Sequence, residues 1–162
     1  MPVLVVGSLR SVRADAGRLR ATHVLSILDP GTPAPDLFMP HGRHVVLNVE
    51  DVQDAGTAER PGPDEAFVAA VIAFARSVPE DGRVVVHCHA GRSRSPAAAI
   101  LMLSEWGLEP VLPGVAAFPN ERILAIAEAL TGRPLLKAGE AARRLAAQAL
   151  LLAEDASCPR SP

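Results

Sequence analysis

The chain has 162 residues, with 16 Lys and Arg against 18 Asp and Glu, so its formal net charge is −2 at pH 7. Hydrophobic residues make up 49% of it, which is enough for the core of one compact domain. The charge balance argues against a nucleic-acid binder held by a general basic surface. No run approaches the roughly 20 apolar residues of a membrane span, and the first apolar run is too short for a signal peptide.

The cysteine content bears on the cellular compartment of the protein, and the basic residues bear on its source. Two cysteines cannot form a disulfide framework, which favours a reducing cytoplasm. All basic residues except Lys137 are Arg, and Tyr is absent, a bias that suggests a GC-rich bacterial genome rather than a function. The spacings of the candidate metal ligands match no short metal-binding pattern, and we expect no metal: His23, His41, His44 and Cys158.

Short apolar runs alternate with helical patterns along the chain, which is typical of an α/β fold. Near-continuous apolar runs rich in β-branched residues predict parallel strands at 3–6, 23–28, 44–49 and 83–87. Helical periodicity and end signals predict helices over about 63–78, 95–107, 120–132 and 139–154. We therefore expect one domain over residues 1–154, with a mostly parallel sheet of about four or five strands flanked by helices on both faces. Residues 155–162 are expected to form a flexible tail.

The segment VVVHCHAGRSRSP at 84–96 has the composition of an anion-binding site. It places Cys88 at the end of a strand, followed by five residues, Arg94 and a helix start. Such a loop points several backbone N–H groups inward, with the helix dipole behind them. Gly91 lets the backbone approach an anion, and Arg94 can hold two phosphate oxygens at once. The same positive field favours a thiolate at Cys88, which is the form that attacks phosphorus.

The complete pattern His-Cys-x-x-Gly-x-x-Arg-Ser resembles the active-site loop of the cysteine-dependent protein tyrosine phosphatase superfamily. Its mid-chain position and the short chain resemble the compact dual-specificity members. The resemblance implies a tyrosine phosphatase-like fold and a reaction that needs no cofactor. Further pieces within residues 1–137 resemble a small bacterial group of predicted tyrosine phosphatases: Leu28-Asp29-Pro30, Asp51-Val52, residues 87–99 and Pro119-Asn120-Glu121-Arg122.

The resemblance also implies a general acid on a loop upstream of Cys88, which would protonate the leaving group. Asp51 and Asp54 both follow the third predicted strand. Asp51 is preferred because it lies at the strand end and matches the family's position, and Asp54 stays the alternative. Ser95 is expected to assist departure of the Cys88 thiolate, or to cap the following helix.

The remaining loop residues are expected to bind phosphate, mainly through backbone amides: His89, Ala90, Gly91, Arg92, Ser93 and Arg94. His87 is expected either to orient the loop and help lower the pKa of Cys88 or simply to lie satisfied in the core. Asn120 is expected to line the pocket or brace the loop, or to cap a helix. Cys158 as a resolving thiol for oxidised Cys88 is the less favoured reading of that residue.

These residues predict a phosphatase that hydrolyses phosphate monoesters through a phospho-cysteine at Cys88. The substrate is expected to be a phosphorylated protein, with phosphotyrosine first and dual specificity open, or a small phosphorylated molecule. No aromatic segment for a deep phosphotyrosine slot is evident. Two alternatives remain: a phospho-ligand-binding module without turnover, and a phosphatase of inositol phosphates or phosphoinositides, for which Arg43 and Arg92 would supply charge. A sulfurtransferase or arsenate reductase fits less well, since Arg94 and Ser95 suit phosphate esters.

Overall fold

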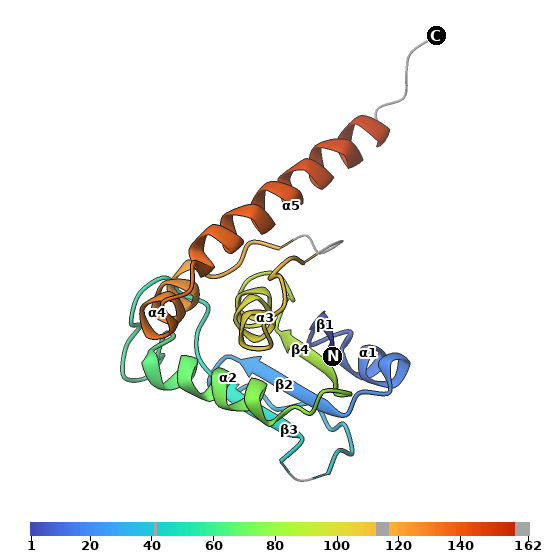
Figure 1. Ribbon diagram of the computed structural model, residues 1–162, viewed down its shortest axis with the longest axis vertical. Coiled ribbons are helices and arrows are strands. Elements are labelled where there is room, and N and C mark those ends of the chain that lie inside the picture. Colours follow the sequence, from blue (N-terminus) through green and yellow to red (C-terminus); the bar gives the residue numbers. More distant parts are fainter. Residues whose placement is uncertain (41, 113–116, 158–162) are drawn as a thin grey trace.

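The computed structural model describes residues 1–40, 42–112 and 117–157, with side chains as far as residue 148. One sheet holds all four predicted strands, in the order β1-β4-β2-β3 and parallel throughout. The strands are β1 (Val3–Ser8), β2 (His23–Leu28), β3 (His44–Asn48) and β4 (Arg83–Cys88). The predicted α/β class and mostly parallel sheet are confirmed (Figure 1).

In the described part of the chain, five helices flank the sheet: α1 (Val12–Leu19), α2 (Glu65–Ser77), α3 (Arg94–Glu105), α4 (Glu121–Thr131) and α5 (Leu135–Ser157). The sequence analysis did not predict α1, because this helix has only eight residues, contains Gly17 and buries little apolar surface. Helix α5 begins four residues before its predicted start. Gly139 therefore lies inside it, where a Cβ would come within 2.4 Å of Leu124 Cδ1 on α4. The glycine allows two helices to pack closely and does not mark a helix start.

The expected tail at 155–162 falls partly within α5, which continues to Ser157. Residues 158–162 lie outside the described part of the chain, so their flexibility stays a prediction. None of the described helices is both long and apolar enough to cross a membrane.

Alternate residues of the two central strands pack against opposite sides of the sheet, as strand geometry requires. Leu25 of β2 and Val84 of β4 belong to the larger core cluster, beneath α2, α3 and α4. Val24 and Val85 pack instead against Val12 of α1. Burial on both faces explains why these strands read as continuous apolar runs in the sequence.

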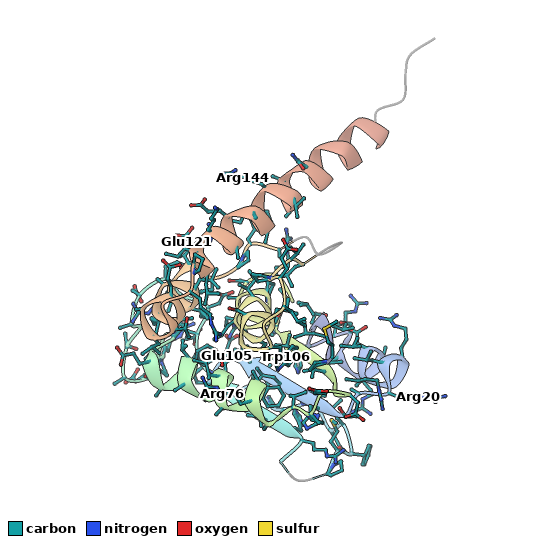
Figure 2. The ribbon with its side chains drawn as sticks, viewed as in Figure 1. Arg20, Arg76, Glu105, Trp106, Glu121 and Arg144 are labelled. Carbon is teal, nitrogen blue, oxygen red and sulfur yellow. The ribbon has the colours of Figure 1, made fainter. Side chains whose placement is uncertain are left out.

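Polar contacts fasten the helices around this core. Figure 2 shows Arg76, Glu105 and Trp106 where α2 meets the end of α3. The Arg76 guanidinium donates to Glu105, and the Trp106 indole N–H donates to the Ala75 carbonyl, each over 2.8–2.9 Å. At the other end of the domain Asn120 caps α4, since its side chain accepts from Ile123 N–H.

The parallel arrangement gathers functional residues at one edge. All carboxyl ends of the strands lie at the same edge of the sheet, where ligands of open α/β folds bind. Cys88 is the last residue of β4, and Asp29 directly follows the last residue of β2. Asp51 lies three residues after Asn48, the last residue of β3. Helix α3 starts there with Arg94.

Leu25→Ala should lower the free energy of unfolding by about 2–5 kcal/mol, because the side chain is fully buried between the sheet and its helices. Urea denaturation followed by circular dichroism measures this loss. Leu145→Ala on α5 is the control, since that side chain is 48% exposed and its loss should change stability by less than about 0.5 kcal/mol. Equal losses in the two variants would contradict the assignment of the core.

Candidate active site

The loop between β4 and α3 wraps around the sulfur of Cys88. This side chain is 1% exposed. Its Sγ accepts hydrogen bonds from the Gly91 amide and from the Ser95 hydroxyl, each at 3.2 Å. The loop is also fastened to the end of β1, where Leu9 N–H donates to the His89 carbonyl. The sulfur therefore sits inside a ring of donors.

Gly91 is required by the shape of this loop. Its φ is +74°, a region that side-chain-bearing residues rarely adopt. A Cβ at this position would also lie 2.7 Å from the carbonyl oxygen of Gly7. The loop can fold over β1 only because residue 91 has no side chain.

Opposing effects set the pKa of the Cys88 thiol. Burial raises it, because a thiolate is poorly solvated in the interior. Hydrogen bonds from the Ser95 hydroxyl and from the amides of Ser95, Gly91 and Ser93 lower it and outweigh burial. The pKa is therefore lowered, the direction that the sequence analysis expected for a nucleophile.

Arg94 is buried at the start of α3, with 3% of its side chain exposed. Its Nη1 donates to the Asp29 carboxylate and to the Val49 carbonyl, both at 2.6 Å. Its Nε has no hydrogen-bond partner among the residues that the structure describes. A buried, unpaired donor of a fixed guanidinium is a ready position for an anion's oxygen.

The sequence analysis did not predict the role of Asp29. Leu28-Asp29-Pro30 is one of the segments that carry the family resemblance, but its carboxylate was not expected to bind Arg94. Its signal was its place directly after a buried strand of a parallel sheet, where side chains reach the same edge as Cys88. The charge of Asp29 compensates part of the cost of burying Arg94.

Asp51 lies against the loop and Asp54 does not. Asp51 Oδ1 accepts from Ser93 Oγ at 2.7 Å and from Asn120 Nδ2 at 2.9 Å, and its Oδ2 lies 3.9 Å from Arg94 Nε. Asp54 is exposed, and its carboxylate accepts from the amide of Gly56 in its own turn. Of the two candidate acids, the structure brings Asp51 to the site.

The chain segment that leads into α4 forms one wall of the loop. Phe118 N–H donates to the Arg92 carbonyl at 2.8 Å, and Asn120 N–H donates to the Ser93 carbonyl at 3.2 Å. The Arg92 guanidinium lies over the Phe118 ring, 5.4 Å from its centroid. The sequence analysis found no aromatic residue for this site. The signal for Phe118 was its position just before Pro119-Asn120.

Asn120 does two things at once, both among the expected ones. It caps α4 through its side-chain oxygen, and its side-chain amide donates to Asp51 and to the Val52 carbonyl. Arg122 donates to the Pro63 carbonyl and so holds the loop after Asp51 from the same helix. The side chains of His89 and Ala90 are exposed. These two residues take part in the loop through their backbone groups.

His87 is fully buried, and its ring nitrogens have two different partners. Nδ1 lies 3.3 Å from the Cys88 carbonyl oxygen, and Nε2 lies 2.6 Å from Ser26 Oγ. Burial lowers the pKa of His87 to about 4; the bond to the Cys88 carbonyl opposes this shift and the charge of His44 adds to it. The imidazole is therefore neutral at pH 7.

Among the described residues, no group of three or more His, Cys, Asp and Glu side chains is arranged to hold a metal ion. His41 and Cys158 lie outside the described residues. The pairing of Cys158 with Cys88 therefore stays untested.

No protein-family model matches the chain. Over 82 residues, 51% of this chain, it is 30% identical to the MAP kinase phosphatase with leucine-rich repeats protein 2 of Dictyostelium discoideum. The chain spans 10% of the length of that relative.

Solved structures resemble the fold over most of its length. The Cydia pomonella PTP-2 phosphatase has a TM-score of 0.57 and 22% identity, over 78% of this chain and 84% of that one. The Yvh1 phosphatase domain from Chaetomium thermophilum has a TM-score of 0.55 and 21% identity, over 82% of this chain and 93% of that one. A variant of human DUSP28 has a TM-score of 0.51 and 19% identity, over 93% of this chain and 94% of that one. The fold is that of tyrosine and dual-specificity phosphatases.

Ser95→Ala should raise the pKa of Cys88, because it removes the hydroxyl donor to the sulfur while burial continues to oppose the thiolate. The pH dependence of iodoacetamide alkylation, followed on the Cys88 peptide by mass spectrometry, reports this shift. Ser104→Ala near the other end of α3 should leave the profile unchanged. An unshifted profile for Ser95→Ala would show that the hydroxyl does not stabilise the thiolate.

The buried, neutral side chain of His87 should make the stability of the fold fall in mild acid. Below pH 6.5 the unfolded chain takes up a proton at residue 87, whereas the folded chain resists it until pH is near 4, so stability falls across this window. Between pH 7 and pH 5 the loss from His87 alone is about 2 kcal/mol. Urea denaturation at both pH values measures it, and His87→Asn should remove that part. His23 and His44, whose pKa values burial also lowers, add to the remainder.

Proposed function

We propose that this protein is a cysteine-dependent phosphatase that hydrolyses phosphate monoesters through a phospho-cysteine at Cys88. One observation carries the proposal: a buried sulfur that accepts hydrogen bonds from the loop leading into α3, together with the buried Arg94 at the start of that helix, whose Nε has no hydrogen-bond partner in the described residues. This pairing of nucleophile and anion site is what attack on a phosphate ester requires. The phosphatase-type fold supports it. The proposed catalytic unit spans residues 1–154.

In the first step the Cys88 thiolate attacks phosphorus and the bond to the leaving oxygen breaks. Arg94 and the amides of residues 89–94 hold the non-bridging oxygens, and their fixed orientation favours the charge that develops there. Asp51 in its acid form gives its proton to the leaving oxygen. Ser93 and Asn120, which donate to the other side of this carboxylate, keep it beside the loop.

In the second step water attacks the phospho-cysteine. Asp51, now a carboxylate, takes a proton from this water, and inorganic phosphate leaves as the sulfur–phosphorus bond breaks. The Ser95 hydroxyl, 3.2 Å from the sulfur, donates to the departing thiolate. No redox partner or metal enters either step.

Phosphotyrosine proteins are the substrate class that we favour, with dual specificity as an extension. Phe118 supports this preference, because it is 40% exposed and presents an aromatic surface beside the loop. Arg92 is engaged with that ring, which argues against its use for a second phosphate of an inositol substrate.

Hydrolysis of para-nitrophenyl phosphate without added metal tests the proposal. Cys88→Ser should abolish turnover and retain phosphate binding. Asp51→Ala should lower kcat about 10²–10⁴-fold, as expected for a lost general acid. Asp54→Ala is the matched control and should keep wild-type kcat, because its carboxylate faces its own turn.

Two results would overturn the proposal. Wild-type protein that is folded and binds vanadate without any turnover would be a phospho-ligand-binding module. Turnover that survives Cys88→Ser would place the chemistry on another residue.

A further inference from the structure

A chain of three polar side chains runs across the sheet behind the loop. His87 of β4, Ser26 of β2 and His44 of β3 come from adjacent strands. Ser26 Oγ lies 2.6 Å from His87 Nε2 and 2.7 Å from His44 Nε2. Ser26 and His87 are fully buried and directly paired in register, whereas His44 is half-buried near the sheet edge.

The hydrogen-bond donors of this chain can be assigned from chemistry. The Cys88 carbonyl oxygen can only accept, so His87 Nδ1 carries the proton of the neutral ring. His87 Nε2 is then an acceptor, and the Ser26 hydroxyl donates to it. Because Ser26 has one proton, its oxygen accepts from His44 Nε2–H. The hydrogen bonds run in one direction, from His44 through Ser26 and His87 to the Cys88 carbonyl.

This direction matters for the nucleophile. With Ser26 in place, the Nδ1–H dipole of His87 points at the last carbonyl of β4, next to the sulfur. Without the Ser26 hydroxyl, Nε2 of this buried ring loses its partner in either tautomer, so the contact that fixes the ring's orientation is gone. The Nε2–H tautomer would in addition turn the Nδ1 lone pair toward the Cys88 carbonyl, where two acceptors repel. Ser26 therefore holds the ring with its Nδ1–H directed at that carbonyl.

Packing by itself does not call for these residues. Val24 and Leu28 lie on the same side of β2 as Ser26 and are fully buried apolar side chains. A polar residue at such a depth costs free energy unless it is hydrogen-bonded, and apolar side chains would fill the same space without that demand.

We propose that Ser26 and His44 are positioning residues of the active site, which hold His87 in the tautomer that supports the Cys88 end of the loop. The inference rests on the proposed phosphatase function. Neither side chain touches the reacting sulfur, and both act through His87. His44 is the outermost member of the chain and acts through Ser26.

Ser26→Ala should lower kcat for para-nitrophenyl phosphate about 3- to 10-fold, the equivalent of one lost hydrogen bond, with KM unchanged. It should also raise the pKa of Cys88, measured by the pH dependence of iodoacetamide alkylation of the Cys88 peptide. His44→Leu should give a smaller loss in the same direction. His44→Gln, whose amide N–H can reach Ser26, should restore most of it.

A double-mutant cycle separates this role from general destabilisation. Because His44 acts through Ser26, Ser26→Ala combined with His44→Leu should lose no more than Ser26→Ala by itself. His23→Leu is the matched control. His23 is another buried histidine of the same sheet, it pairs with Thr22, and its loss should change stability without moving the alkylation profile.

Three outcomes would overturn the proposal: an unshifted alkylation profile for Ser26→Ala, additive losses in the cycle, or a profile for His23→Leu that shifts equally. If Ser26→Ala fails to fold, the comparison of His44→Leu with His44→Gln decides instead, since residue 44 is half-buried. The alkylation readout needs no turnover. If the wild-type protein has no turnover but Ser26→Ala shifts the alkylation profile of Cys88, the positioning role is supported and the phosphatase function fails. If the wild-type protein is active but the profile does not shift, the phosphatase function stands and the positioning role fails.

Discussion

The buried guanidinium of Arg94 organises the carboxyl edge of the sheet. A cation with 3% of its side chain exposed is tolerated only when nearby groups replace its hydration. The Asp29 carboxylate comes from the end of β2 and the Val49 carbonyl from the end of β3, while Arg94 itself follows β4. One side chain thus joins three strand ends, while its Nε has no hydrogen-bond partner within the described structure and lies 3.9 Å from the Asp51 carboxylate.

The thiol of Cys88 depends on the same edge in a different way. Burial works against the thiolate, and hydrogen bonds from the loop and from Ser95 more than offset it. These donors converge because residue 91 has a positive φ and no side chain. The loop therefore brings amide donors to a sulfur that is almost completely buried.

Two polar networks hold this loop from opposite sides. On one side Asn120 joins the start of α4 to Asp51, and Ser93 adds a second donor to the same carboxylate. On the other side the His44–Ser26–His87 chain reaches the Cys88 carbonyl through the sheet. Each network links a loop to a regular element, so the geometry of the site follows from the packing of the fold.

The sequence alone determined those features whose residues are neighbours in the chain. The strands were predictable because burial on both faces leaves continuous apolar runs, and the loop was predictable because Cys88, Gly91 and Arg94 lie within one turn-forming segment. The preference for Asp51 over Asp54 as the acid rested on its place at a strand end and on the family resemblance, and the acid role stays a prediction. The end of α4 was likewise signalled locally, by Gly132.

Tertiary structure decided what joins distant segments. Arg94 and Asp29 are 65 residues apart, and His87 and Ser26 are 61 apart. Nothing in their local patterns indicates that β4 lies between β1 and β2, and this strand order creates both contacts. Gly139 misled the prediction for a related reason: close packing on Leu124 overrides its local meaning as a helix boundary. Local propensity depends on residues that are neighbours in the sequence. The pairing of buried charged and polar groups depends on distant residues, which come together only when the sheet forms.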